Sequence, residues 1–145
     1  MFTNHRNAAH NYSTVNVTSG AMTATPHGLI LMLFEGAMLA VAASRMHLEG
    51  GRIADKAQAI SKAVAIIQDG LMASLDRDTG GEIADKLFLL YEYMVVKLTE
   101  ANIGNRQEPL EEVGRLLAEL NSAWETIGGH ERISTFEAES AGRQS

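Results

Sequence analysis

The chain has 145 residues, and 46% of them are apolar, so one domain can bury a sizeable core without disulfides or metal staples. It contains no cysteine, which excludes disulfide scaffolds, thiolate zinc sites and cysteine nucleophiles and suits a reducing, cytoplasmic compartment. The net charge is −6. Residues 1–51 contain two arginines and two glutamates, so all of the excess negative charge lies in residues 52–145. Without a basic stripe, nucleic acid and anionic lipid are poor partners.

Residues 1–25 form the first segment, which is rich in Asn, Thr and Ser and contains no acidic residue. This composition predicts a flexible segment. It carries too little positive charge, and the apolar run follows too late, for a secretory signal. As an alternative to disorder, Tyr12, Val15 and Val17 could lie as an extended strap in a groove, forming a self-capping segment.

The first helix is predicted from Pro26 to about Glu49. Proline suits the first helical position, and Thr25 before it can cap the free backbone donors. Residues 29–34 are all apolar, and a helix that is apolar all round is buried on most sides. The apolar run is 15 residues long with Glu35 inside it, short of the roughly 20 that a membrane-spanning helix needs, so we expect no membrane insertion.

The second helix is predicted over about residues 52–75, ending at the turn of residues 76–78. It carries a core stripe at helical spacing and, beside it, a stripe of mostly small residues that would let another helix approach closely. The core stripe is Ile53, Ala57, Ile60, Val64, Ile67 and Leu71; the small-residue stripe is Ala59, Ala63, Ile66, Gly70 and Ala73.

The third helix is predicted to begin at a capping box, Thr79 with Glu82 three residues later, and to stop near Gly104. It too has a core stripe and a second apolar stripe. The core stripe is Ile83, Leu87, Leu90, Met94, Leu98 and Ala101; the second is Phe88, Tyr91 and Val95.

The fourth helix is predicted from about Pro109 to Gly128-Gly129, followed by a mobile C-terminal tail at residues 130–145. Its apolar positions follow one strict stripe, which we assign to the core: Leu110, Val113, Leu117, Leu120, Trp124 and Ile127. Four helices joined by short loops predict an all-α fold, an antiparallel four-helix bundle over residues 26–129.

The surplus stripes on the second and third helices are the main functional signal. Apolar surface beyond what a core can bury usually marks a partner site on a soluble protein. The alternative is a wide core stripe, in which case the same residues pack against the first or fourth helix.

Catalytic chemistry finds little support in the residue patterns. None of the five histidines has a partner at metal spacing, and no phosphate or dinucleotide loop is present, so we predict no metal, no cofactor and no enzyme. Glu35 is a lone carboxylate without a visible partner. His47 could accept phosphate, as the exposed histidine of a histidine phosphotransfer module does. In such modules a lysine and a glycine typically follow the histidine and support it, whereas here Leu48, Glu49 and Gly50 follow.

Several short motifs, in order, resemble one family. The strongest stretch is Gly80-Gly81-Glu82-Ile83-Ala84, then Leu90-Tyr91-Glu92-Tyr93-Met94, Leu98 and Ala101-Asn102, and later Ala123-Trp124. Upstream, Ala24-Thr25-Pro26 and Met32-Leu33-Phe34-Glu35-Gly36-Ala37 precede it. Together they resemble the flagellar export chaperone family FliS over about residues 21–128. The family usually has tyrosine where this chain has Phe34, so a hydrogen bond from that hydroxyl is absent here.

The resemblance implies a cytoplasmic chaperone, not an enzyme, that binds the disordered C-terminal region of flagellin, prevents its polymerisation and delivers it to the flagellar type III export apparatus. We predict that the client-binding residues are Ala63, Ile66, Gly70, Phe88, Tyr91 and Val95. Two other classes stay open: a helical structural protein that self-associates as a homodimer through the same stripes, and the phosphotransfer module at His47.

Overall fold

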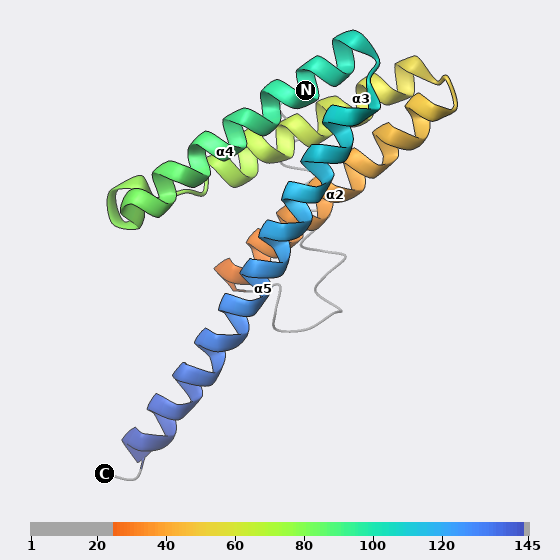
Figure 1. The fold of residues 1–145 in the computed structure, drawn as a ribbon. Helices are drawn as coiled ribbons and strands as arrows, with labels where there is room; N and C mark the ends of the chain where they lie inside the picture. Colours follow the sequence, from red (N-terminus) through yellow and green to blue (C-terminus); the bar gives the residue numbers. More distant parts are fainter. Residues whose placement is uncertain (1–24, 144–145) are drawn as a thin grey trace.

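The structure is a computed structural model that describes the backbone of residues 25–143 and the side chains of residues 25–128. This part of the chain is helical and contains no strand, which confirms the predicted all-α fold (Figure 1). The elements are α2 (Pro26–Glu49), α3 (Ile53–Ala65), the π-helical η3 (Ile66–Met72), α4 (Arg77–Gly104) and α5 (Gln107–Arg143).

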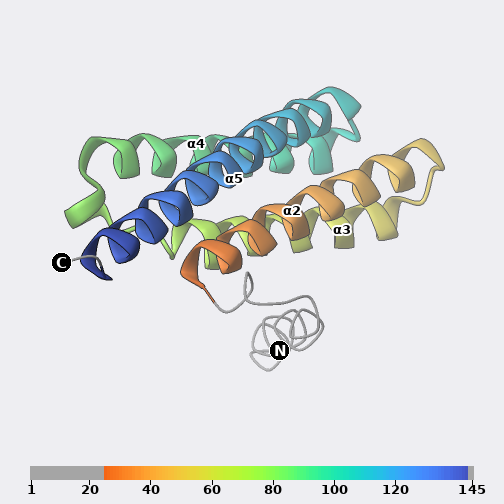
Figure 2. The same ribbon diagram turned by 90° about the horizontal axis from the view of Figure 1, so that it is seen from below.

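Consecutive helices reverse direction, so the chain forms two antiparallel hairpins that pack on each other (Figures 1 and 2). The α2–α3/η3 hairpin forms one layer and the α4–α5 hairpin the other, with α2 against α5 and α4 against α3 and η3. The C-terminal part of α5 extends beyond the other helices (Figure 1). One end of the bundle therefore holds the α2–α3 and α4–α5 connections, and the other holds the starts of α2 and α4.

The core lies between the two hairpins and contains most of the predicted stripe positions. Its large buried side chains are Phe34, Val41, Ile60, Ile67, Leu71, Met94, Leu98, Leu110, Val113 and Leu117. Three predicted core residues are instead exposed: Ile53, Ile83 and Ile127. They lie near the ends of the packed region, where the neighbouring helix no longer covers them.

The long apolar helix α2 is packed within the bundle, as its composition predicts. Its N-terminus is capped as expected, because the Gly28 backbone N–H donates to Thr25 Oγ1 at 2.9 Å. By length and composition α2 is the one helix in the described part of the chain that could cross a membrane. Its buried face against α3 and α5 is that of a core helix, so it does not indicate a span. The side chains of Leu39 and Met46 on α2 are exposed.

The second predicted helix has an unexpected end. Residues 66–72 adopt π-helical rather than α-helical bonding, which the apolar spacing cannot reveal. Gly70 lies in this stretch, where a Cβ atom would stand 2.8 Å from a methyl carbon of Leu33 on α2. Gly70 thus permits close approach of a helix, as its small size predicts, but the helix belongs to the same chain.

The start of α4 corrects the predicted capping box. The cap is Asp76, whose carboxylate accepts hydrogen bonds from the backbone N–H groups of Asp78 (3.2 Å) and Thr79 (3.1 Å). One turn, residues 77–80, precedes a kink at Gly81, which has φ 56° and ψ −134°. Because only glycine adopts these angles without strain, the kink separates this turn from the rest of α4.

The predicted end of the fourth helix at Gly128-Gly129 was wrong. The backbone stays helical from Gln107 to Arg143, so the helix covers most of the segment predicted as a tail. Each glycine in a helix costs only about 1 kcal/mol relative to alanine, which weakens a helix without ending it. The predicted mobility of residues 130–145 is not tested, and the self-capping residues Tyr12, Val15 and Val17 lie outside the described residues.

A buried lysine ties α3 to the end of α4. Lys56 is only 2% exposed, and its Nζ donates to the Asn102 carbonyl oxygen (2.9 Å) and to Asn105 Oδ1 (2.6 Å). Asn105 ends α4 in the left-handed conformation, with φ 51°. The ammonium therefore satisfies carbonyl and amide oxygens at a helix C-terminus, where positive charge is favourable.

We expect Lys56→Met to lower the free energy of unfolding by about 1–3 kcal/mol, because it leaves two oxygens at the end of α4 without their donor. Urea denaturation followed by circular dichroism measures the change. Lys62→Met, at an exposed position of α3, is the matched control and should change stability little. Equal effects of the two substitutions would contradict a structural role for Lys56.

Candidate functional site

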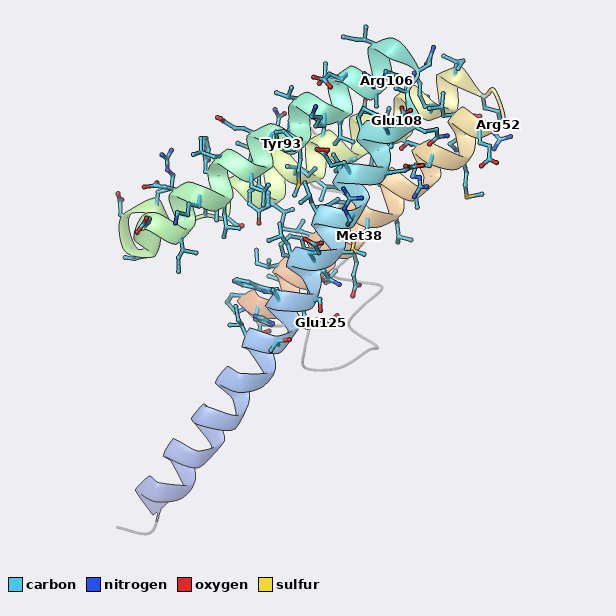
Figure 3. All side chains as sticks on the ribbon, viewed as in Figure 1. Met38, Arg52, Tyr93, Arg106, Glu108 and Glu125 are labelled. Carbon is cyan, nitrogen blue, oxygen red and sulfur yellow. The ribbon has the colours of Figure 1, made fainter. Side chains whose placement is uncertain are left out.

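An apolar groove of about 440 Å³ opens where α2 and α4 begin and α5 passes between them. Its walls carry aliphatic and aromatic side chains, and Asp76 is its one charged lining residue. The main apolar lining residues are Phe34, Leu75, Ile83, Leu87, Tyr91 and Trp124. Charged side chains such as Arg106 and Glu108 lie at the opposite end of the bundle (Figure 3).

The α5 wall is fixed by contacts with the first turn of α2. The rings of His27 and Trp124 stack, with centroids 5.0 Å apart and planes 9° from parallel. Trp124 Nε1 also donates to the backbone oxygen of His27 at 3.2 Å. Gly128 completes the contact, because a Cβ atom there would collide with the His27 imidazole. Trp124 was predicted as a core residue; the structure leaves it half-buried at the groove.

The α4 wall consists of Ile83, Leu87 and Tyr91, on successive turns. Ile83 is 73% exposed, so its side chain stands at the mouth, whereas Tyr91 is almost fully buried. Burial raises the pKa of Tyr91 to about 12. Its hydroxyl makes no hydrogen bond with residues in the described part of the chain. This wall thus offers apolar surface with one polar hydroxyl.

A third wall is formed by the cap residue Asp76 together with Thr79 and Gly80 of the turn of residues 77–80. Hydrogen bonds from the Thr79 side chain and backbone hold the pKa of Asp76 below its usual value. The Arg77 side chain contacts two residues on the far side of the kink. Its Nε lies 3.0 Å from Asp85 Oδ1, and its guanidinium lies 4.4 Å from the Phe88 ring centroid.

The six predicted client-binding residues do not form one exposed face. Ala63 is fully buried in the core, Gly70 faces Leu33, and Tyr91 lines the groove. The other three, Ile66, Phe88 and Val95, are half-buried, and Arg77 covers the Phe88 ring. Whether any of the six contacts a client stays a prediction.

Sequence reasoning missed the groove because it placed Ile83 and Ile127 in core stripes and read Gly80-Gly81 as part of a continuous first turn behind the predicted capping box. The available signal was that glycine pair, since a kink there changes which apolar side chains the neighbouring helices can cover. A second signal for the groove was the large side chain of Trp124 near the end of the predicted fourth helix.

Other candidate chemistry finds little support. Among the described residues, no cluster of His, Cys, Asp or Glu could hold a metal ion. His47 lies in the last turn of α2, where its Nδ1 accepts a hydrogen bond from Arg52 Nε at 3.0 Å. Glu35 is exposed on α2.

The sequence matches the family described as "Flagellar protein FliS" over residues 8–131. The chain belongs to the FliS family. It is 47% identical to the flagellar secretion chaperone FliS of Salmonella typhimurium over 116 residues, which cover 80% of this chain and 86% of the relative. It is 40% identical to the flagellar secretion chaperone FliSB of Pseudomonas aeruginosa, over 80% of this chain and 91% of the relative. It is 30% identical to the flagellar secretion chaperone FliS of Bacillus subtilis, over 86% of this chain and 92% of the relative. The resemblance noted in the sequence is thereby confirmed.

Val95 and Val96 are adjacent on α4 of this FliS-family chain, and substituting each in turn distinguishes effects on the core from effects on the surface. Val95 packs against the core, whereas Val96 is 54% exposed. We expect Val95→Lys to lower the free energy of unfolding by about 1–3 kcal/mol, because a charge enters apolar surroundings, and Val96→Lys to change it by less than about 0.5 kcal/mol.

Thermal and urea denaturation measure both variants. If Val95→Lys folds as stably as the unsubstituted chain yet loses client binding, Val95 is a client contact rather than a core residue. That result would contradict the packing described above.

Proposed function

We propose that this chain is a cytoplasmic export chaperone that binds the disordered C-terminal region of flagellin, prevents its premature polymerisation and presents it to the flagellar type III export apparatus. Two facts support the proposal: its relatives are named flagellar secretion chaperones, and the bundle has an apolar groove with no occupant from residues 25–128. The groove is the observation that carries it. The proposed role is binding, without catalysis.

The groove suits an amphipathic helix of the client. Such a helix presents apolar side chains at positions i, i+3/i+4 and i+7 along one face, which suits an apolar groove between helices. Leu87 and Phe34 give the interior of the groove, and Ile83 and Ile127 give exposed apolar edges. Large aromatic side chains usually carry much of an interface's energy, and the half-buried Trp124 supplies one here.

A disordered client fits the task of an export chaperone. Its folding on the surface costs ordering entropy, so a large apolar area can be covered without an affinity that prevents release. The predicted contacts Ile66, Phe88 and Val95 are half-buried on η3 and α4, and a client longer than the groove could reach further along these helices. Tyr91 belongs to both the predicted set and the groove.

Self-association is the competing proposal, and one observation favours it. Leu89, Val96 and Ile103 recur every seven residues on the outside of α4 and are 63%, 54% and 82% exposed. Sedimentation of the client-free chain distinguishes the two: a stable homodimer that dissociates on Val96→Lys would favour the competing proposal.

Two isoleucines on α4 provide a matched test of the groove. Ile83 lines it and is 73% exposed, whereas Ile103 is 82% exposed and does not line it. We expect Ile83→Asp to weaken binding of the flagellin C-terminal segment by about tenfold or more, because a charge enters the apolar contact. Ile103→Asp should leave the affinity unchanged, and neither should unfold the chain.

Isothermal titration calorimetry with the full chain and the flagellin C-terminal segment measures both affinities. Stoichiometric binding with a large negative heat-capacity change supports coupled folding and apolar burial. Equal loss of affinity in the two variants, or none in either, would place the client elsewhere on the bundle.

A further inference from the structure

The turn of residues 77–80, here called the flap, is set apart from the rest of α4. Gly81 follows it with φ 56° and ψ −134°, one turn into what is otherwise one helix. Residues with a side chain rarely adopt this conformation, so glycine supplies a joint at which the backbone can turn. The flap is thus a single helical turn, capped by Asp76 at one end and followed by the Gly81 joint at the other.

The side chain of Arg77 connects the flap to the main part of α4. Arg77 spans the joint, pairing with Asp85 at 3.0 Å and lying over the Phe88 ring at 4.4 Å. Both partners lie beyond Gly81. The Arg77 and Asp85 side chains are 54% and 55% exposed, so the fastening is solvated and breakable. An exposed cation–π contact adds a similarly modest contribution.

The same flap forms one wall of the groove. Thr79 and Gly80 line it from the flap, while Ala123 and Trp124 line it from α5. A rotation about Gly81 would therefore move Thr79 relative to Trp124 and change the width of the groove. The buried side of α4, with Leu98 and Ala101 in the core, would stay where it is.

We propose that residues 77–80 act as a hinged flap that controls access to the apolar groove, with Gly81 as the hinge and Arg77 as the latch. Arg77 is a positioning residue: it sets where the flap stands. The proposed gating of flagellin binding rests on the function proposed above, whereas the motion of the flap does not. Loss of the latch shifts the flap toward the open position and speeds the entry of a helical client.

The chain allows a direct optical test, because it has no cysteine and Trp124 is its one tryptophan. Thr79→Cys carries bimane, a dye that a tryptophan quenches only at short range. Since Thr79 and Trp124 line the same groove, the label should be quenched in the latched state. Labelled full-length chains are compared with and without Arg77→Gln, Asp85→Asn and Arg77→Lys.

Without client, Arg77→Gln should raise the open-to-closed ratio by about fivefold, because it removes both latch contacts. Asp85→Asn should give a smaller rise, and Arg77→Lys should restore part of the quenching. Lys86→Gln is the control, since it breaks an exposed ion pair with Glu82 (3.3 Å) and leaves the latch intact. Equal quenching in all variants would overturn the proposed motion of the flap. So would a rise in the open-to-closed ratio of Lys86→Gln equal to that of Arg77→Gln.

The gating is tested by stopped-flow mixing of unlabelled chains with the flagellin C-terminal segment. We expect Arg77→Gln to raise the association rate constant severalfold over the unsubstituted chain and over Lys86→Gln. An unchanged rate despite a loss of bimane quenching would overturn the gating. Absence of binding by every chain would overturn the proposed function, while the client-free bimane comparison still decides whether the flap moves.

Discussion

The close packing of α2 against α3, η3 and α5 is the constraint on which the rest of the structure depends. Small residues make it possible: Gly36, Ala37 and Ala40 are buried along α2, and Gly70 admits Leu33 from the opposite side. Even the buried Ser44 adds no unpaired polar group, because its hydroxyl donates to the Val41 carbonyl at 2.6 Å. α2 thereby joins the two hairpins, and α4 can pack on the other side of α3.

The groove follows from where this packing stops. At the end of the bundle with Lys56, a buried ammonium satisfies oxygens at the C-terminus of α4 and ties α3 to it. At the other end, the His27–Trp124 stack fixes α5 against α2, α4 is kinked at Gly81, and apolar side chains between these elements line an open groove. Buried apolar area stabilises the fold, so surface left uncovered at one end is available to a partner.

Much of the fold could be predicted because helix periodicity and capping are local. The single stripe on α5 predicted the burial of Leu110, Val113 and Leu117, and Pro26 after Thr25 predicted the start of α2. The groove could not be predicted in the same way, because it depends on how the starts of α2 and α4 lie relative to α5. Tyr91 illustrates the limit: its helical position predicted a second stripe, but only tertiary packing shows that it lines a groove.

The measurement that tests the central claim most directly is the emission of Trp124 during titration with a tryptophan-free flagellin C-terminal segment. Because Trp124 is the chain's one tryptophan and lines the groove, its spectrum reports on that wall alone. Occupation of the groove predicts a shift to shorter wavelength that saturates at one segment per chain, as water leaves the indole. Calorimetrically proven binding with an unchanged spectrum would contradict the assignment of the groove as the client site.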